Sequence, residues 1–528
     1  MIKWERCSNE LPATQFLILN IALGFGHFIT ILNAGAYLPM LPYVAGGIGE
    51  GLPYVVRGQS NYFAAMGAAF LIARPLMLRF GAINTALTAY LLFALSCWLI
   101  LLTTSIYPLM TAARTLQGFS AGFSLSPSLS ILLMHYKKPK QHIAVALWGV
   151  AAFTPFSIGP ALGGFFAYVL GNWRLLFTIS ACLITLVAAV IWLLHRKSVY
   201  GFDSTYPIQS HLFLFLLFAV ACIALQEFFN IGLISALTSR EDELWLAAAI
   251  FCLFSALFWF KNKNTEFPLL NFKIFKYPNY AFGLVMLCIA FMALQSSIVQ
   301  YLIRLQLVEG YTAWHAGLLF LPIFVFSKPL NVLAQYLIHH GYDPRVLACI
   351  SCFGFALSFW WMSTYTRPAP WESLLLPQFL EGAAMGLLLI SMTTIALGNV
   401  PAEEQLHAVD ILNTFRNLSA GLAITLSDIG WDHYLAYVKN HMTFQGSIAK
   451  EALSAHFYTL GFSESAVQHL FRLKVNSVSG LLTLNAMFYT LALIFILLGM
   501  AVWWASPKHI VHKSTVQDSV VESLGEEP

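Results

Sequence analysis

Residues 148–164, WGVAAFTPFSIGPALGG, lie inside an apolar run that extends from about 143 to 170. Six residues of this stretch are glycine or proline: Gly149, Pro155, Gly159, Pro160, Gly163 and Gly164. In lipid no water competes for the backbone groups, so a helix persists here and bends where each proline removes a hydrogen bond. Gly159 and Gly163 are four residues apart and share a face, which lets a second helix approach closely. The stretch therefore predicts a bent membrane helix packed tightly against a neighbour.

The composition of the whole chain agrees with a membrane setting. Hydrophobic residues make up 59% of the 528 residues and charged residues only 10%, whereas about a quarter of an ordinary soluble protein is charged. An all-α polytopic membrane protein is therefore expected. The net charge of +4 is small, and no basic tract with interleaved aromatic residues suggests nucleic acid as a partner. Cys349 and Cys352 have CxxC spacing without a second ligand pair, so no metal or other cofactor is predicted.

Runs of about 20 apolar residues are long enough to cross a bilayer as helices. The sequence contains about fourteen such runs, at 14–38, 59–79, 83–104, 106–134, 141–169, 173–195, 208–228, 243–260, 278–303, 312–338, 345–364, 374–399, 405–430 and 479–504. An even number of spans places both ends of the chain on the same side of the membrane.

The positions of Lys and Arg predict which side that is. If the termini are inside, the inner segments hold sixteen of the 28 basic residues. The short outer loops hold only five: Arg57, Arg174, Arg240, Arg304 and Arg367. Because cytoplasmic loops are enriched in Lys and Arg, both termini are expected in the cytoplasm, and the chain is expected to cross the bacterial inner membrane.

The order of the spans predicts the domain organisation. Residues 1–200 are expected to form a six-helix bundle, 201–262 an inserted helix pair, 263–504 a second six-helix bundle and 505–528 a cytoplasmic tail. A long outer loop at 432–478 contains SESAVQHLFRLKV, whose apolar spacing predicts a short amphipathic helix. This loop is either a cap that packs on the outer mouth or a docking surface for a periplasmic partner.

Ionisable side chains inside membrane helices are costly and therefore mark candidate functional positions. Arg114, on the fourth predicted helix, needs water or a partner for its charge, and backbone carbonyls are the purely structural alternative. Glu381, on the twelfth, lies between Leu380 and Gly382, where loss of water disfavours the charged carboxylate. It is either a proton or cation carrier or a member of a structural ion pair. His27, on the first helix, either titrates or is a hydrogen-bonded packing residue.

Further polar residues are expected to face a cargo cavity between the two bundles. Lys328 lies close to mid-membrane and either pairs with Glu381 or binds an anionic cargo. Asp410, Asn413 and Asn417 are spaced three and four apart, which forms a polar stripe on the thirteenth helix. The substrate-cavity candidates are Asn33, Lys328, Asn331, Gln378, Asn413, Arg416 and Asn417. The proton-coupling candidates are Glu381, Arg114, His27 and Asp410.

Three stretches resemble signatures of the major facilitator superfamily. Residues 146–164, ALWGVAAFTPFSIGPALGG, resemble the antiporter signature of its drug:proton exporters, especially the fourteen-helix branch typified by EmrB and QacA. Residues 114–128, RTLQGFSAGFSLSPS, and 377–401, PQFLEGAAMGLLLISMTTIALGNVP, resemble two further helices of that branch. The resemblance implies two six-helix bundles plus two inserted helices. It also implies that the antiporter stretch seals the interface between the halves and that Arg114 is linked to proton movement. Branch members usually carry an aspartate where this chain has Asn33, which cannot titrate.

The function implied by the resemblance is secondary active export of amphipathic small molecules, with the proton gradient as energy source and no cofactor. Family members often work with a periplasmic adaptor and an outer-membrane channel. A narrower hypothesis, prompted by Lys328, is export of an anionic metabolite such as a siderophore. The alternatives are an importer of a siderophore or other organic anion and a membrane sensor that transports nothing. The sequence contains no convincing nucleophile and base constellation and no nucleotide-binding Gly-Lys-Ser/Thr loop, so an enzyme is not expected.

Overall fold

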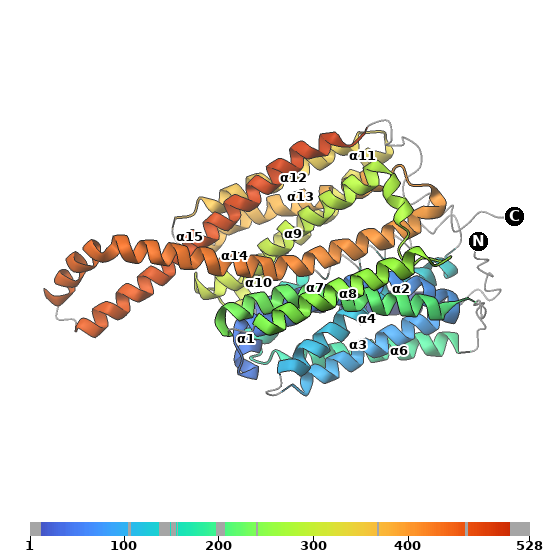
Figure 1. Cartoon of the computed structure of the whole chain (residues 1–528), viewed down its shortest axis with the longest axis horizontal. Coiled ribbons are helices and arrows are strands. Elements are labelled where there is room, and N and C mark those ends of the chain that lie inside the picture. The colour runs from blue at the N-terminus through green and yellow to red at the C-terminus, as the bar shows by residue number, and fades with distance from the viewer. Residues whose placement is uncertain are drawn as a thin grey trace.

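The structure is a computed structural model that describes residues 12–103, 107–136, 148, 151, 155, 157–196, 206–238, 241–366, 369–459 and 463–506. Every regular element in these ranges is helical, and the long helices run roughly parallel to one axis of the molecule (Figure 1). A helix satisfies all of its interior backbone groups within one segment, which is what a chain surrounded by lipid requires.

The first bundle contains these helical segments: α1 (Ala13–Ile48), α2 (Leu52–Phe80), α3 (Ala82–Leu101), α4 (Tyr107–His135), Ser157–Val169 with its terminal π-helical turn η2 (Phe165–Val169), and α6 (Arg174–His195). α4 packs against both α2 and α3, and α6 packs against α3 and α1. α1 and α2 each end at a glycine with positive φ, Gly49 at 74° and Gly81 at 82°, a backbone conformation that other residues rarely adopt.

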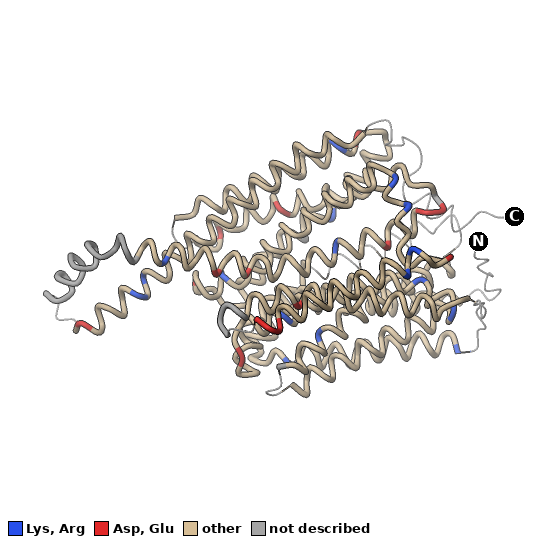
Figure 2. The backbone as a smooth tube through the Cα atoms, viewed as in Figure 1, with Lys and Arg blue, Asp and Glu red and all other residues tan. Residues whose placement is uncertain are grey.

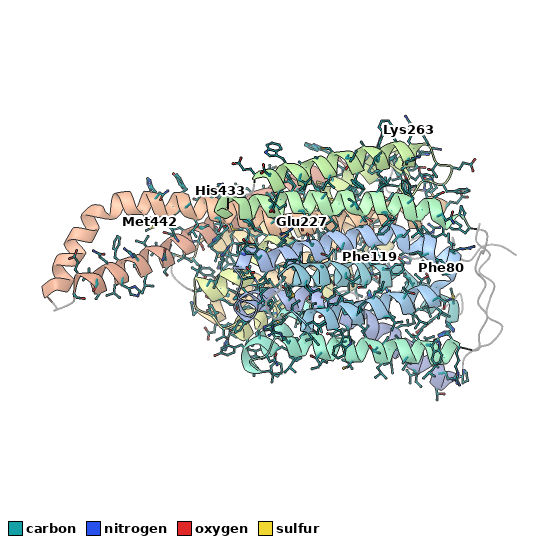
Figure 3. The ribbon with its side chains drawn as sticks, turned by 60° about the horizontal axis from the view of Figure 1, so that its bottom comes forward. Phe80, Phe119, Glu227, Lys263, His433 and Met442 are labelled. Carbon is teal, nitrogen blue, oxygen red and sulfur yellow. The ribbon has the colours of Figure 1, made fainter. Side chains whose placement is uncertain are left out.

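Two long helices follow, α7 (Ile208–Thr238) and α8 (Glu241–Lys263), and they pack on each other. α7 also contacts α2 of the first bundle and α14 (Ala402–Thr459) of the second. The pair therefore lies along the seam between the bundles, as the green helices of Figure 1 show. Figure 3 labels Lys263 of α8 toward the end of the molecule opposite His433 and Met442, with Glu227 of α7 between them.

The second bundle contains the remaining elements: η3 (Phe272–Lys276), α9 (Pro278–Leu307), α10 (Ala313–Leu318), α11 (Leu321–His339), α12 (Pro344–Ser363), α13 (Trp371–Leu397), α14, α15 (Glu464–Ala501) and η4 (Val502–Trp504). α13 packs against α11 and α12, and α15 packs against α12. Asp343 caps α12 by accepting a hydrogen bond from the backbone N–H of Arg345 at 2.9 Å.

The described helices match the predicted spans. Eleven of them are long and apolar enough to cross a membrane, one of which runs continuously through α10 and α11. Together with α4, α14 and the segment Ser157–Val169, they account for the predicted count of about fourteen. The middle of the bundle carries few charged residues, and Lys and Arg are most frequent toward the end opposite α14's free tip (Figure 2).

The segment expected as a long loop at 432–478 is instead a helical hairpin. α14 continues to Thr459 and α15 begins at Glu464, so two helical arms project beyond the bundle, where Figure 3 labels His433 and Met442. The loop prediction was wrong because residues 431–459 contain no proline and one glycine, and extending an existing helix avoids the cost of nucleating a new one. The predicted amphipathic helix forms the first turns of α15, with Val467 buried while Leu470 and Leu473 are exposed.

Candidate functional site

The glycine-rich stretch packs its first face on α1. A Cβ atom built at Gly163 would lie 1.9 Å from the carbonyl oxygen of Ala36, and one at Gly159 would lie 2.8 Å from the Ala36 nitrogen. Real Cβ atoms do not approach backbone atoms this closely, so only glycine permits the two helices to touch here. Pro155 is helical and buried, while Gly149 lies outside the described residues.

The other face of the same stretch meets the second bundle. A Cβ at Gly164 would lie 2.2 Å from the carbonyl oxygen of Ala313 in α10. A Cβ at Gly317 of α10 would lie 2.2 Å from the carbonyl oxygen of Pro160. The two backbones therefore touch reciprocally, and the stretch joins α1 on one face to α10 of the opposite bundle on the other. We name the Gly164–Ala313 and Gly317–Pro160 contacts the glycine seam.

Arg114 of α4 is fully buried and is held by amide oxygens and aromatic rings. Its guanidinium donates hydrogen bonds to the side-chain oxygens of Gln117 and of Gln59 on α2. The guanidinium carbon lies 4.1 Å from the ring centre of Tyr37 and 4.5 Å from that of Tyr62. Within the described part of the chain, no carboxylate forms an ion pair with Arg114. The first bundle thus stabilises a permanent positive charge without a neutralising partner.

His27 and Asn33 of α1 both point into the first bundle. The His27 ring stacks on Trp148 at 4.7 Å, and neither ring nitrogen has a hydrogen-bond partner among the described residues. His27 is therefore packed by an aromatic face and is not the hydrogen-bonded residue that one of the two sequence hypotheses described. Asn33 donates hydrogen bonds to the carbonyl of Ile29 at 2.9 Å and to the hydroxyl of Ser180 on α6 at 3.0 Å.

Glu381 of α13 is a carboxylate buried in the second bundle, with 5% of its surface exposed. It belongs to none of the ion pairs found among the described residues, and no hydrogen bond to its carboxylate occurs there. The next residue, Gly382, brings α13 so close to α11 that a Cβ would lie 2.7 Å from the Cα of Ile323. The buried phenol of Tyr301, on α9, has no hydrogen-bond partner and lies within electrostatic range of both Glu381 and Glu309.

Lys328 and Asn331 both lie on α11, next to the helix that carries Glu381. Lys328 is half-buried, and the described residues contain no ion pair between Lys328 and Glu381. Asn331 accepts a hydrogen bond from Gln335 at 3.2 Å. Gln378 of α13 is fully buried, and its amide donates a weak hydrogen bond to the sulfur of Met362 at 3.7 Å.

The polar stripe lies near the N-terminal end of α14. Asp410 and Asn413 are half-buried, and Asn417 donates a hydrogen bond to the carbonyl of Asn413 at 2.8 Å. Asp410 is within electrostatic range of Arg74 on α2, across the two bundles. The Arg416 guanidinium instead lies over an aromatic ring of α9, 4.8 Å from its centre. Asp410, Asn413 and Asn417 therefore share one face of α14, while Arg416 points elsewhere.

A polar cluster that the sequence did not suggest joins α2, α7 and α14. We name it the three-helix network, and its members are Arg57, Ser60, Asn61, Gln226, Glu227, Asn230 and Thr425. The side-chain oxygen of Asn230 accepts hydrogen bonds from Ser60 at 2.9 Å and from Thr425 at 2.6 Å. Glu227 pairs with Arg57 and accepts a hydrogen bond from Asn61. Arg57, expected in an outer loop, is thus part of α2, and Glu227 links α7 to the first bundle.

A second unexpected ion pair lies within the second bundle. Arg304 of α9, also expected in an outer loop, contacts Asp428 of α14 at 3.2 Å and is only 8% exposed. Gln300 bridges the two, accepting from Arg304 at 3.0 Å and donating to Asp428 at 2.7 Å. The guanidinium also lies 3.9 Å from the ring centre of Trp431.

Breaking this pair from one side is expected to destabilise the protein. Asp428→Ala leaves a buried guanidinium without its counter-charge, which costs about 3 kcal/mol of unfolding free energy. The double variant Arg304→Met with Asp428→Leu removes both charges and is expected to recover most of the loss. Thermal unfolding of the purified protein in detergent measures both effects. Equal melting temperatures for wild type and Asp428→Ala would show that the pair contributes nothing.

Glu309 lies in the connection between α9 and α10, outside the spans, and gives the stability a defined pH dependence. Burial raises the pKa of Glu309 to about 7, opposed in part by a hydrogen bond from the backbone of Ala369. The folded state therefore binds this proton more tightly than the unfolded state does. Stability is expected to fall as pH rises from about 4.5 to 7 and then to level off. Glu309→Gln is expected to raise the melting temperature by a few degrees at pH 8 and by less at pH 5. An equal increase at both pH values would contradict the assignment.

The molecule consists of two helix bundles whose backbones touch at the glycine seam. Each bundle buries a charged side chain, Arg114 in the first and Glu381 in the second. These features are typical of a polytopic membrane transporter. Among the described residues, no group of three His, Cys, Asp or Glu side chains is placed to hold a metal ion. The family model of the Major Facilitator Superfamily matches residues 23–424, and the chain belongs to that family.

Relatives of known name agree along nearly the whole chain. The multidrug export protein EmrB of Haemophilus influenzae is 25% identical over 520 residues, which cover 95% of this chain and 98% of the relative. EmrB of Escherichia coli K12 is 24% identical over 94% of this chain and 97% of its own length. The fatty acid resistance protein FarB of Neisseria gonorrhoeae is 23% identical over 93% of this chain and 96% of its own. The chain is thus similar to EmrB-type exporters and is a membrane transporter.

Solved structures agree on the fold. A crystal structure of the peptide transporter POT in complex with sulfate covers 95% of this chain and 97% of its own, with a TM-score of 0.61 and 14% identity. A bacterial homologue of the human lysosomal transporter Spinster, in an inward-facing and unoccupied conformation, matches with a TM-score of 0.58 and 12% identity over 94% of this chain and all of its own.

Proposed function

We propose that this transporter exports amphipathic small molecules across the bacterial inner membrane and is driven by proton entry, with no cofactor. The observation that carries the proposal is Glu381, a buried carboxylate that no described Lys or Arg neutralises. A carboxylate without a partner is costly in the membrane, so it requires a proton, a cation or water. The names of EmrB and FarB, relatives that export drugs or confer fatty acid resistance, support export of amphipathic compounds.

The coupling of proton entry to cargo export follows from the groups that can neutralise the Glu381 carboxylate. With a proton bound, the side chain is neutral and tolerates the close contact of α13 with α11 beside Gly382. Without the proton, the carboxylate needs water or the positive group of a cargo molecule. Proton and cationic cargo therefore exclude each other at this residue, and binding of one releases the other. Tyr301, whose hydroxyl has no hydrogen-bond partner among the described residues, lies within electrostatic range of Glu381 and is the residue that we propose to respond to the loss of the Glu381 proton.

The glycine seam is the element that we assign to alternating access. It holds α10 of the second bundle against the antiporter stretch of the first, so it closes the passage on one side while it is intact. Only a change that separates Gly164 from Ala313 opens that side. Arg114, Asp410 and the α14 stripe then lie on the route between the bundles as candidate polar contacts.

The orientation is part of the proposal. Arg57 and Arg304, two of the five basic residues counted in outer loops, lie within helices and form ion pairs there. The short outer loops then hold even fewer basic residues, which strengthens the prediction of cytoplasmic termini. The hairpin of α14 and α15 consequently projects into the periplasm. It offers a helical surface to the proposed periplasmic adaptor, which would pass cargo to an outer-membrane channel.

An organic anion such as a siderophore is the second candidate cargo, in either direction of transport. Lys328 favours it, because it places a half-buried cation on α11, the helix that packs against α13. A cation held near mid-membrane attracts an anionic group. Export of cations and transport of anions are therefore separated by measuring both cargo classes in the same preparation.

The test uses vesicles of both orientations that contain the wild-type protein. Labelled tetraphenylphosphonium and a labelled iron-chelating organic anion are supplied in turn, with the pH gradient intact or collapsed by an ionophore. Gradient-dependent accumulation of the cation in everted vesicles is the expected result. Accumulation of the anion in everted vesicles assigns the narrower export function. Accumulation only in right-side-out vesicles contradicts export and supports import, and no gradient-dependent flux at all contradicts transport of these cargo classes.

A further inference from the structure

The three-helix network lies where α14 of the second bundle meets α2 of the first. A Cβ atom built at Gly421 of α14, one turn before Thr425, would lie 2.9 Å from the carbonyl oxygen of Ser60 on α2. Thr425 lies three residues before Asp428, which pairs with Arg304 near the end of α9. α10, which forms the glycine seam, follows α9 after a short connection. The two bundles therefore touch at this end of the molecule through two separate contacts, the glycine seam and the meeting of α2 with α14.

Four side-chain contacts attach α7 to α2, and one of them is an ion pair. Glu227 of α7 pairs with Arg57 and accepts a hydrogen bond from Asn61. The amide of Asn230 donates to Asn61 at 3.1 Å, and its oxygen accepts from Ser60 at 2.9 Å. Hydrogen bonds to an ionised carboxylate are about twice as strong as those between neutral groups. Parting Glu227 from Arg57 would also separate two charges inside the membrane, so detaching α7 from α2 is costly.

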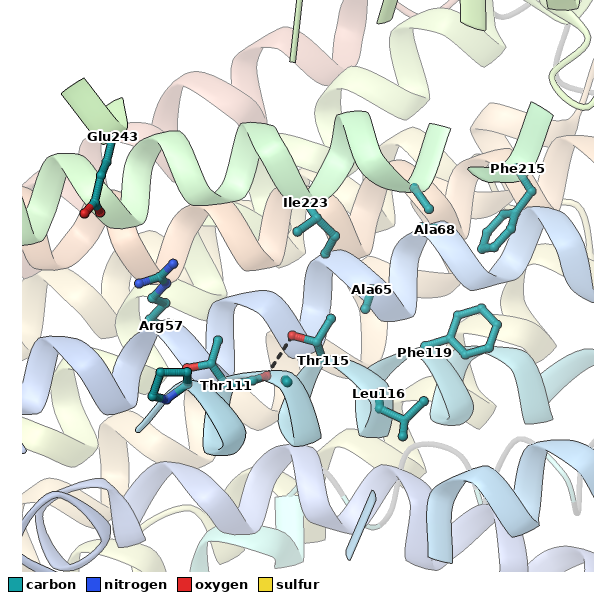
Figure 4. Close-up of a pocket in the computed structure, with 13 residues that line it drawn as sticks. Arg57, Ala65, Ala68, Thr111, Thr115, Leu116, Phe119, Phe215, Ile223 and Glu243 are labelled. Carbon is teal, nitrogen blue, oxygen red and sulfur yellow. Dashed lines mark hydrogen bonds between the residues drawn. The ribbon is translucent and has the colours of Figure 1, made fainter. Parts of the chain in front are cut away.

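The polar attachment of α7 to the first bundle runs through α2 rather than α4. A groove of about 720 Å³ is lined by residues of α2, α4, α7 and α8. Figure 4 shows Arg57 at one end of this groove and Phe119 and Phe215 at the other. α4 and α7 approach each other at these two rings, whose centres lie 5.8 Å apart. The four polar contacts of α7 described above all end on α2 instead.

The attachment of α7 to α14 is weaker. The hydrogen bonds that join these two helices in the network both use one side chain, Thr425. Its hydroxyl donates to the oxygen of Asn230 at 2.6 Å and accepts from the amide of Gln226 at 3.0 Å. Both bonds join neutral groups, and moving one hydroxyl away breaks both of them. The network is therefore asymmetric, with an ion pair on the α2 side and a single hydroxyl on the α14 side.

We propose that α7 moves together with α2 when the two bundles part at this end, and that the network opens at Thr425. The inserted helix α7 thus belongs to the first bundle in the conformational cycle, and Thr425 is its releasable contact with the second. The contacts between α7 and α2 are then present in both conformations. An interaction shifts a conformational equilibrium only when its free energy differs between the two conformations. The inference rests on the alternating access proposed above, but not on the cargo or on proton coupling.

The test compares Thr425→Val with Ser60→Ala, because each removes one hydroxyl that donates to the same oxygen of Asn230. The reporter is a cysteine at Gln306 of α9, whose amide donates a hydrogen bond to the carbonyl of Pro39 across the bundles at 3.2 Å. Its labelling rate by an impermeant maleimide is measured in lipid nanodiscs without cargo or gradient, after correction for the same protein without that cysteine. Thr425→Val is expected to raise the rate about fivefold or more. Ser60→Ala is expected to leave it unchanged.

Two further variants keep the comparison informative. Thr425→Ser retains the hydroxyl and is expected to label at the rate of the parent protein. Gln226→Leu removes one of the two contacts with Thr425, so a smaller rise is expected, and this variant repeats the test if Thr425→Val unfolds. Thermal unfolding is expected to show similar losses of a few degrees in Thr425→Val and Ser60→Ala, which separates the labelling effect from a general loss of stability.

Three outcomes would overturn the proposal. An equal rise in both variants would mean that α7 parts from α2 as well as from α14. A rise only in Ser60→Ala would place α7 with the second bundle, and no rise in either would show that the network does not hold the bundles together. None of these results depends on flux, so a failure of this inference and a failure of proton-driven export remain distinguishable.

Discussion

Replacing Glu381 by Gln is expected to reduce gradient-driven transport to the level of vesicles that lack the protein. Gln has nearly the same shape as a protonated Glu, so α13 should keep its close contact with α11 beside Gly382. It cannot release a proton, and the exchange of proton for cargo therefore stops at the proton-loaded state. Accumulation of tetraphenylphosphonium in everted vesicles measures the loss.

Glu372→Gln is the matched control for this prediction. Glu372 lies in the first turn of the same helix, α13, but is exposed. It is expected to leave transport unchanged, and both variants are expected to keep the wild-type melting temperature within about one degree. Full gradient-driven transport by Glu381→Gln would remove this residue from the coupling path, and a large loss of stability would make its transport defect uninformative.

The second large effect is expected from Gly164→Leu, which inserts a side chain into the glycine seam. The clash is with the backbone of Ala313, 2.2 Å from a Cβ, so no rotation of a flexible side chain relieves it. Since the seam is a contact between the two bundles, the bundles are expected to part there while each stays folded. Transport should be lost because the conformation in which the glycine seam is closed no longer forms.

Gly163→Leu distinguishes a seam effect from a folding effect. Its clash, 1.9 Å from the carbonyl of Ala36, lies inside the first bundle and is expected to lower the melting temperature strongly. The reporter of seam opening is a cysteine at Gln306, whose amide now donates a hydrogen bond to the carbonyl of Pro39 across the bundles at 3.2 Å. Labelling of that cysteine by an impermeant maleimide should rise in Gly164→Leu. Unchanged labelling, with wild-type transport, would contradict the role of the seam.

Much of the fold was predictable because lipid makes the pattern simple. Apolar runs of about 20 residues must be helices, so thirteen of the fourteen expected runs coincide with helices over most of their length, and the run at 141–169 is described mainly from residue 157. The tight packing at Gly159 and Gly163 was also predictable, because their spacing permits close approach on one face. Which helix would fill that face was not, since glycine spacing carries no information about the partner.

The polar contacts were harder to predict, for two physical reasons. Helix ends are weakly marked in sequence, so Arg57 and Arg304 were expected in loops although they continue α2 and α9 by a turn or more. Hydrogen bonds between helices depend on rotation and register, which place Asn230 beside Ser60 and Thr425 but Arg416 over an aromatic ring. One ion pair could have been predicted, because Asp428 and Arg304 carry opposite charges and each lies near the end of its span.

The most direct test of proton coupling uses proteoliposomes that contain only the purified protein and a pH-sensitive dye. A pH gradient is imposed, and tetraphenylphosphonium is then added on the side from which export begins. Wild-type protein is predicted to dissipate the gradient only when the cation is present, and Glu381→Gln to leave it unchanged under both conditions. Cargo movement by wild-type protein with no change in internal pH would contradict the account, because it would separate transport from the proton that Glu381 is proposed to carry.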